Sequence, residues 1–361
     1  MFATQIGPTG HLKGYFRPET AQGIFVDFKR LIEFNNGRIP FAAAQIGLGF
    51  RNEINPRSGL LRVREFQMAE IEHFYDPSNK DHPRFEEVAE EKLSLFSKEC
   101  QTAISDPIRD MTVAEAVEKK IIDNQILAYY MVRSYKFFRS CGIPEEAIRY
   151  RQHLDTEMAH YASDCWDAEI HTSYGWIEVA GHADRSCYDL EVHTKATGVE
   201  LVGAKPLKEP YEETKILISL NKKVLGKKFK KEFKTLEDHI ASLNEETRQK
   251  LKAEFESTEG NFTVDVEGTS FEIEKENITF DEQKKMVMEE KFTPNVIEPS
   301  FGIGRVIYCI FEHCFNVRPQ DEKRTYFAFP PVIAPVKTSI LPLVSNDDKL
   351  MKLVQKLSKS V

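Results

Sequence analysis

The sequence predicts an α+β fold: an antiparallel sheet flanked by helices, with an inserted subdomain and the start of a C-terminal α/β domain. Three observations support this class. Residues 1–77 and 150–200 contain short strand-like segments, whereas residues 81–141 have helical spacing. Residues 205–290 differ from both, because they are rich in lysine and glutamate and poor in long apolar patterns.

The composition excludes several classes of protein. Hydrophobic residues make up 41% and charged residues 29% of the 361 residues, which is typical of a globular protein of two or three domains and excludes a disordered chain. No uncharged apolar run approaches the roughly 18 residues that span a bilayer, so no membrane partner is expected. The net charge of −8 argues against a surface that is basic throughout, although a local basic face stays compatible with nucleic acid. The six cysteines form no Cys-x-x-Cys pair and are interpreted as reduced thiols.

Two strand-like pieces flank residues 55–59, a stretch rich in turn formers. By the two-residue period of a strand, Arg51 and Glu53 share one face of the first piece, and Arg62 and Phe66 share one face of the second. An antiparallel pair would place guanidinium groups, an aromatic ring and carboxylates on one surface, which suits a nucleoside triphosphate. Composition alone favours a half-exposed sheet laced with ion pairs, and this alternative stays open at this point.

Two helices are predicted next. Pro83 can begin the first, whose body covers residues 86–100. The second begins with Thr112 and Glu115 in a capping-box pattern, in which each side chain satisfies a free backbone amide of the other. It ends just before Gly142, which can adopt the left-handed cap.

The insertion at residues 205–290 contains a basic run. Between residues 221 and 234 there are seven lysines and one glutamate. A solvated helix face and a phosphate-contacting patch are equally good interpretations. The lysines proposed to contact phosphates are Lys222, Lys223, Lys227, Lys228, Lys230 and Lys231.

The end of the chain returns to core-like sequence. A strand ends at Glu298 and a helix follows from about Gly302. The proline-rich residues 330–335 are interpreted as a linker, followed by a strand at 338–343 and a helix at 347–359. One strand and one helix cannot make a domain, so these residues are predicted to start a further domain.

The order and spacing of residues 50–70 resemble motif 2 of the class II aminoacyl-tRNA synthetases: Phe-Arg-x-Glu, a short loop, then Arg-x-x-x-Phe-x-x-x-Glu. Residues 299–305, Pro-Ser-Phe-Gly-Ile-Gly-Arg, are similar to motif 3 of the same class. Within it, the resemblance narrows to the glycyl-tRNA synthetase family of the eukaryotic and archaeal dimeric type. The strings that carry it lie at residues 17–23, 40–47, 64–73, 183–189 and 295–301.

The resemblance implies a domain organisation. Residues 1–204 match the catalytic core with motif 2, 205–290 an insertion, 291–329 the core with motif 3, and 330–361 a linker and the start of the anticodon-binding domain. Only sixteen residues precede Arg17, so motif 1 is expected to be absent and the sequence to be a fragment of a longer synthetase.

It also implies a function for the full-length parent: ATP-dependent activation of glycine to glycyl-adenylate, and transfer to tRNA(Gly). ATP and Mg²⁺ are the expected cofactors, with glycine, tRNA(Gly) and a second copy in a homodimer as partners. The expected compartment is the cytoplasm, with a mitochondrial form left open. The alternative is a non-catalytic synthetase-like accessory or binding module, from which loss of the matched ATP and glycine residues would be expected.

The family's site residues carry over position by position. The motif 2 arginine, matched by Arg51, bridges the ATP α-phosphate and the amino-acid carboxylate, and Arg305 matches the motif 3 arginine; both are expected to be catalytic. The other expected ATP contacts are Glu53 and Phe66 at the adenine, Arg62 at the γ-phosphate and Glu178 near Mg²⁺. The expected glycine-binding residues are Glu19, Glu70, Glu298, Ser300, Asp184 and Arg185.

Elementary chemistry agrees with such a glycine pocket. Glycine offers only an ammonium and a carboxylate, and three converging carboxylates could accept all three ammonium hydrogens. The same crowding is expected to raise the pKa of at least one carboxyl group in the empty pocket. Five histidines near Cys165 and Cys187 fit no familiar zinc spacing, and structural roles are expected for them. These histidines are His153, His160, His171, His182 and His193.

Overall fold

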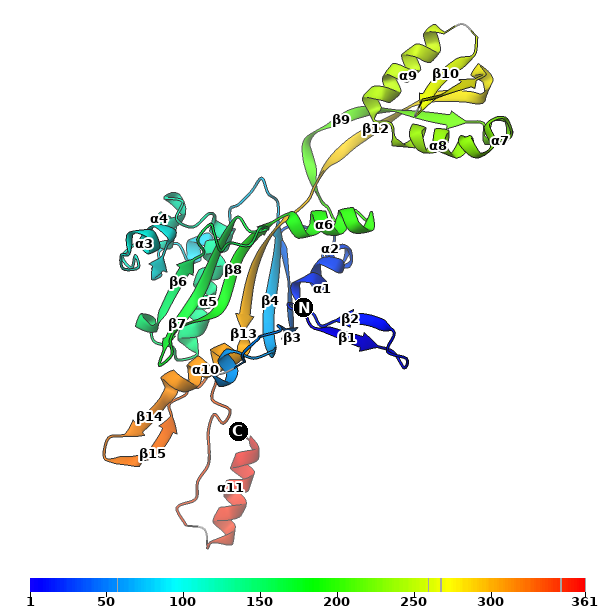
Figure 1. Ribbon diagram of the computed structural model, residues 1–361. Helices are drawn as coiled ribbons and strands as arrows, with labels where there is room; N and C mark the ends of the chain where they lie inside the picture. The colour runs from blue at the N-terminus through cyan, green and yellow to red at the C-terminus, as the bar shows by residue number, and fades with distance from the viewer. Residues whose placement is uncertain (57, 259, 267, 345, 361) are drawn as a thin grey trace. The chain divides into compact units, whose positions relative to one another are not determined.

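The fold is that of a computed structural model (Figure 1). It describes residues 1–56, 58–258, 260–266, 268–344 and 346–360. The chain forms two compact units. The first comprises Met1–Gly203 and Phe292–Val361, and the second comprises Ala204–Lys291.

A seven-stranded sheet forms the centre of the first unit. Its order is β3 (Phe41–Phe50), β4 (Glu65–Tyr75), β13 (Asn295–Gly302), β8 (Gly175–Ser186), β7 (Asp164–Thr172), β6 (Ile148–Gln152) and β5 (Leu95–Phe96). Every neighbouring pair is antiparallel except β5 and β6, so the predicted antiparallel sheet is confirmed. The strand that follows the second unit, β13, lies between β4 and β8 and therefore brings residues from both ends of the sequence together (Figure 1).

Helices cover the sheet and close two hydrophobic cores. On one face α5 (Gln125–Ser140) shares a core with the inner strands and with α10 (Ile303–Cys314). Its largest fully buried members are Trp166, Tyr150, Phe138 and Tyr75. A second core joins the helices α1 (Ala21–Val26), α2 (Phe28–Phe34) and α6 (Tyr188–Thr197) to the sheet through Phe74 and Val296.

The first predicted helix, residues 86–100, is wrong. Leu95 is fully buried and exchanges two backbone hydrogen bonds of 2.8 Å with Ile108, while β5 pairs with β6. Tertiary strand pairing therefore overrides the local helical pattern. A helix begins only at α3 (Lys98–Ala103), where Ser97 accepts a hydrogen bond from the amide of Cys100.

The second predicted helix is two helices. The capping box of Thr112 and Glu115 is confirmed and begins α4 (Val113–Glu118). The chain then breaks at Lys120, which has a positive φ of 58°, and Asn124 caps the start of α5. The cap at Gly142 is confirmed by its φ of 94°.

Other elements complete the first unit. The hairpins are β1 (Ala3–Ile6) with β2 (Leu12–Tyr15), and β14 (Phe315–Arg318) with β15 (Asp321–Phe327). Short 3-10 turns lie at Gly59–Leu61, Phe85–Glu87 and Glu145–Ala147. The predicted strand at 338–343 is wrong, because these residues have no regular structure; the following helix is present as α11 (Asp348–Ser360).

The second unit has its own core. Its elements are β9 (Gly203–Leu220), α7 (Lys222–Phe229), α8 (Phe233–Ser242), α9 (Glu245–Ser257), β10 (Phe262–Val266), β11 (Thr269–Ile273) and β12 (Ile278–Phe292), with 3-10 turns at Lys230–Glu232 and Lys275–Asn277. The strands β9 and β12 pair with each other, and β10 and β11 form an antiparallel hairpin. Apolar side chains of both helices and strands, among them Leu225, Leu236, Phe271 and Ile273, are buried together. Across the described part of the chain, no helix has the length and apolar character needed to cross a membrane.

Candidate active site

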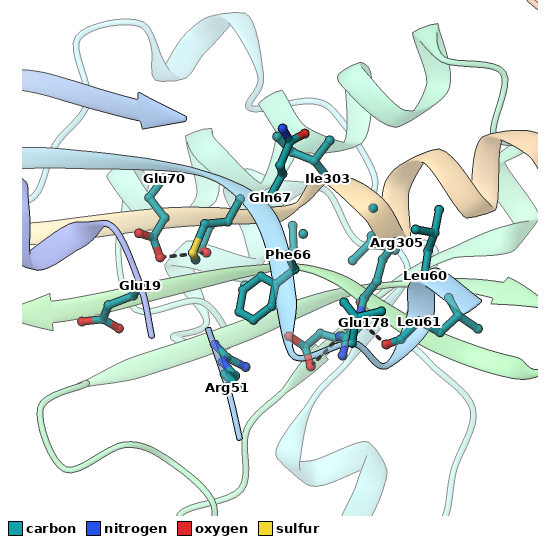
Figure 2. A pocket seen from close by; sticks show the side chains of 18 of the residues that line it. Glu19, Arg51, Leu60, Leu61, Phe66, Gln67, Glu70, Glu178, Ile303 and Arg305 are labelled. Atoms are coloured by element: carbon teal, nitrogen blue, oxygen red, sulfur yellow. Dashed lines mark hydrogen bonds and ion pairs between the residues drawn. The ribbon is translucent and has the colours of Figure 1, made fainter. Parts of the chain in front are cut away.

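A cavity of about 420 Å³ lies in the first unit, against β4, β8 and β13 and the start of α10. Figure 2 shows its side chains converging from these elements and from the loop before β4. Ten of the twelve residues expected to bind ATP or glycine line it: Glu19, Arg51, Glu53, Arg62, Phe66, Glu70, Glu178, Glu298, Ser300 and Arg305. The structure thus gathers residues that are up to 286 positions apart in sequence (305 − 19).

An arginine and an aromatic ring mark one end of the cavity. The guanidinium carbon of Arg51 lies 5.3 Å from the ring centre of Phe66 (Figure 2). A Cβ atom at Gly49 would lie 2.8 Å from the same ring, so glycine is required there for the ring to pack against the strand. The planar face of Phe66 and the fork of Arg51 provide a stacking surface and a bidentate anion ligand side by side.

The predicted strand pair around this end is only partly correct. The strands β3 and β4 pair as expected, but β3 ends at Phe50 and β4 begins at Glu65, so Arg51, Glu53 and Arg62 all belong to the connecting loop. Turn-forming residues make this loop longer than the period-two pattern indicated. The amide of Arg51 still donates to the carbonyl oxygen of Arg64, at 3.0 Å, which holds the loop closed.

Two more arginines of the cavity are engaged with carboxylates. Arg62 forms an ion pair with Glu53 at 3.0 Å. Arg305 donates to the backbone oxygens of Leu61 and Glu178, at 3.2 and 2.8 Å, and lies 3.5 Å from the Glu178 carboxylate (Figure 2). Arg305 therefore ties the loop before β4 to β8 while its charge faces the cavity.

Carboxylates dominate the other end. The Glu70 carboxylate accepts hydrogen bonds from the amides of Thr20 and Ala21, at 2.6 and 2.8 Å, and from the Thr20 hydroxyl. These donors are free because they lie at the first turn of α1, and the helix dipole favours a negative charge there. Its second oxygen accepts from the hydroxyl of Ser300 at 3.2 Å. Glu70 is thus held by the fold, with one oxygen directed at Ser300.

Arg185 lies behind these carboxylates and does not line the cavity. It is buried, donates to Glu298 and to Asp189, and lies 3.7 Å from Glu19. Its guanidinium also lies 4.2 Å from the ring centre of Tyr161. Asp189 and Tyr161 were not anticipated from the sequence; the nearby string at 183–189 was the available signal. Arg185 therefore orients a carboxylate of the cavity.

Burial makes the Glu298 carboxyl group a weaker acid than usual, because its pKa is raised. Desolvation raises its pKa most, the Arg185 charge opposes this, and the neighbouring Glu70 charge raises it further, to about 7. Behind it, Glu72 is fully buried and neither of its carboxyl oxygens has a hydrogen-bond partner among the described residues. Desolvation and the charge of Glu298 raise the pKa of Glu72 well above its ordinary value. The raised pKa of Glu298 agrees with the expectation for the empty pocket, whereas Glu72 does not line the cavity.

The structure does not bring Asp184 to the cavity, contrary to the expectation for that residue. It is fully buried and accepts hydrogen bonds of 2.9 Å from the Tyr75 hydroxyl and the Asn124 amide. The reason is the period of a strand: Asp184 and Arg185 are neighbours on β8 and must point to opposite faces. Asp184 therefore joins the sheet to α5.

Comparison with known proteins shows to which family this chain belongs. The model of the tRNA synthetase class II core domain (G, H, P, S and T) matches residues 12–314. This chain belongs to the class II tRNA synthetase core family. The fold class predicted from the sequence is confirmed with it, and the cavity described above lies within the matched class II core.

Three relatives of this class II chain are named glycine–tRNA ligase. The chain is 52% identical over 361 residues to a protein named glycine–tRNA ligase from Drosophila melanogaster and 51% identical over 347 residues to one from Caenorhabditis elegans. The alignments cover 100% and 96% of this chain but 47% and 46% of those proteins. A glycine–tRNA ligase from Methanocaldococcus jannaschii is 44% identical, with 99% of this chain and 62% of that protein covered. The chain spans about half the length of the first two relatives.

A solved structure also aligns with the chain. It is the Giardia lamblia prolyl-tRNA synthetase in complex with prolyl-adenylate, with a TM-score of 0.44 and 12% identity over 99% of this chain and 45% of that one.

Proposed function

We propose that this chain carries the catalytic centre of a glycine–tRNA ligase. In the first reaction, a glycine carboxylate oxygen attacks the α-phosphorus of ATP, and the bond from that phosphorus to the pyrophosphate oxygen breaks, giving glycyl-adenylate and pyrophosphate. In the second, the glycyl group passes to a hydroxyl of tRNA(Gly) and AMP leaves. The names of relatives at 44–52% identity support this assignment.

One observation carries the proposal: the cavity has an arginine-rich end and a carboxylate-rich end. Arg51, Arg62 and Arg305 suit the phosphates of ATP, whereas Glu70 and Glu298 suit the ammonium of a small amino acid. A substrate bound across both ends would have its carboxylate beside the α-phosphate, near Arg51. Positioning and charge neutralisation then carry the first step, and no general base is required.

Glu178 is the residue that would hold Mg²⁺ in this cavity. Its side chain is 52% exposed and offers hard oxygen ligands, which suit Mg²⁺ bound through one carboxylate and the substrate phosphates. Bound Mg²⁺ would neutralise phosphate charge. Arg305, which lies 3.5 Å from the Glu178 carboxylate, keeps that side chain at the edge of the cavity.

Further partners follow from the same proposal. We propose tRNA(Gly) as the second substrate and a homodimer as the working assembly of the whole protein, in the cytoplasm. A mitochondrial form also stays open, since one relative, from Saccharomyces cerevisiae and 48% identical, is named glycine–tRNA ligase 1, mitochondrial. The Lys-rich run of the second unit is the proposed phosphate-contacting surface.

The alternative, a non-catalytic synthetase-like module, would be expected to have lost arginines or carboxylates of the cavity, whereas ten of the twelve matched residues line it. The deciding test is glycine-dependent exchange of labelled pyrophosphate into ATP by the purified protein. We expect exchange with glycine and little with alanine or serine. Binding of ATP without any amino-acid-dependent exchange would favour the accessory module.

A further inference from the structure

Three side chains with metal-binding atoms meet on the sheet in the wall of the cavity. His153 follows β6, and its amide donates to the carbonyl oxygen of Cys165 at 2.9 Å, so the two residues lie opposite each other on neighbouring strands. Asp167 is two positions further along β7 and therefore shares the face of Cys165. Sequence spacing did not reveal this group, because strand pairing, not a short motif, assembles it.

The ligand atoms of these residues are close enough to share one ion. One atom each of His153, Cys165 and Asp167 lie within 4.8 Å of one another. In a tetrahedral zinc site such atoms are roughly 3.4–3.6 Å apart, as follows from the usual bond lengths. Side-chain rotations that shift the ligand atoms by about 1 Å would bring them to this spacing.

We propose that His153, Cys165 and Asp167 form a binding site for a zinc-type divalent cation. One thiolate, one imidazole and one carboxylate are a ligand set of borderline softness that zinc and cobalt accept, and water can supply a fourth ligand. Partial exposure of His153 and Cys165 gives the ion access. Because Cys165 also lines the cavity, the ion would lie in the cavity wall, beside the residues assigned to glycine.

Two interactions compete with the ion and must yield to it. His153 Nε2 lies 2.8 Å from Asp167 Oδ2, and Arg151 lies 3.5 Å from the same oxygen. Arg151 keeps other partners, since it donates to Glu157 at 2.6 Å and lies 3.4 Å from Glu169. Burial raises the pKa of the Cys165 thiol, so the cation must also displace its proton.

Cobalt titration of the purified protein tests the site. We expect one Co²⁺ per chain with a thiolate-to-cobalt charge-transfer band, and displacement of Co²⁺ by Zn²⁺. Cys165→Ser is expected to abolish the band and weaken Zn²⁺ binding by more than the ~10–100-fold that loss of an outer partner costs. The matched control is Cys187→Ser, because the Cys187 thiol donates to the Glu191 carboxylate and belongs to no group of three potential metal ligands among the described residues.

The result does not depend on one variant. If Cys165→Ser fails to fold, His153→Gln replaces it, and its Co²⁺ spectrum is expected to lose intensity relative to the wild type. Absence of a thiolate band in the wild type, or an unchanged band in folded Cys165→Ser, overturns the proposal and leaves the three residues as a packed ion pair beside an inert thiol. Neither outcome depends on glycine activation.

Discussion

Arg185 and Glu298 form an ion pair in which neither side chain is more than 9% exposed. Glu19, Glu70, Glu72 and Asp189 add their carboxyl groups nearby, so one cation faces an excess of acids. Uncompensated buried charge is costly, and the protein relieves it by retaining protons. A bound ammonium ion would lower this cost instead, so the affinity for the proposed substrate, glycine, is expected to depend on pH.

The first prediction is that glycine binding releases protons near neutral pH. The pKa of Glu298 is raised to about 7 in the empty pocket, and an ammonium beside it favours the carboxylate form. Affinity for glycine is therefore expected to rise with pH between about pH 6 and 8, with proton release greatest at the lower end. Calorimetry in two buffers of different ionisation enthalpy measures the released protons. Glu298→Gln is the control, and zero proton release in the wild type at pH 6.5 would contradict the assignment.

Much of this site could be predicted for two reasons. The sequence strings shared with the family indicate which residues belong to the site, and the two-residue period of a strand indicates which face of the sheet each side chain occupies. Glu70 and Ser300 were expected near each other, and they are directly paired across β4 and β13. Asp184 was expected at the cavity, together with Arg185, because the family resemblance implies it, although alternation along a strand already separates the two. Glu72 was missed because an acid between Ile71 and His73 gives no local sign that it will be buried without a partner among the described residues.

Predictions of individual helices and strands were wrong where contacts between residues far apart in sequence determine the structure. The residues around Leu95 have helical spacing, yet partners at Ile108 and on β6 convert them into a strand. No sequence within ten residues of Leu95 carries that information. Predictions from local sequence were correct where the interacting residues are close in sequence, as in the capping box of Thr112 and Glu115.

The second prediction concerns Arg51, which forms no ion pair with any residue that the structure describes, in contrast to Arg62. Its fork is therefore available to an anionic ligand, which the proposed function identifies as the α-phosphate of ATP. Arg51→Ala is expected to reduce pyrophosphate exchange by roughly 10²-fold or more, by analogy with removal of one oxyanion donor. Lysine is expected to rescue poorly, since it lacks the planar fork. The surface variant Arg30→Ala serves as control, and near-normal exchange in Arg51→Ala would remove this residue from the mechanism.

The third prediction concerns Glu72 and stability. Its pKa is raised in the folded protein, mainly by desolvation, so between the ordinary value of 4.5 and the folded value the folded state binds more protons than the unfolded state. Stability is then lost as pH rises through that window, by up to about 1.4 kcal/mol per pH unit. Glutamine does not ionise, so the Glu72→Gln variant does not lose stability in this way. The stability of this variant relative to that of the wild type is therefore expected to increase from pH 5 to pH 8. Thermal unfolding checks this, with the exposed Glu146→Gln as control; a difference that stays constant with pH would contradict it.

The fourth prediction concerns the lysine-rich surface of the second unit. Lys222 and Lys228 are paired with Glu237 and Glu274, respectively. The lysines that form no ion pair with any described residue are Lys223, Lys227, Lys230 and Lys231. If these contact tRNA phosphates, changing all four to alanine is expected to weaken tRNA binding and to flatten its salt dependence by about 0.7–0.9 in log–log slope per lost contact.

The matched control for this surface is the pair Lys250→Ala and Lys284→Ala, because both lysines lie in the same unit and are paired with carboxylates. Glycine-dependent exchange without tRNA is expected to stay unchanged in all these variants. If the fourfold variant has an unaltered tRNA affinity and an unaltered salt dependence of tRNA binding, the lysine-rich run is a solvated helix face and not a phosphate-contacting surface.

The last prediction is about selection of the smallest amino acid. Alanine has the same ammonium and carboxylate as glycine, so Glu19, Glu70 and Glu298 cannot separate them by hydrogen bonding. Rejection must come from filled space where a β-carbon would project. Such a clash can exceed the ~1–3 kcal/mol by which a pocket prefers one extra methylene, because a packed wall resists movement. Ser300 is the proposed wall, since it lies between Glu70 and Gly181 on the neighbouring strands.

Two substitutions at Ser300 separate bulk from hydrogen bonding. Ser300→Gly removes the side chain and is expected to lower the glycine-to-alanine ratio of kcat/KM by roughly 10-fold or more, with little change in ATP binding. Ser300→Ala loses only the hydroxyl, which donates to Glu70 at 3.2 Å, and is expected to keep most of the ratio. Glu298→Gln is expected to lower the use of both amino acids together. If Ser300→Gly leaves the ratio unchanged, other residues must form the wall, and the space beside Gly181, where a Cβ would meet only Asp167 at 3.8 Å, becomes the next place to examine.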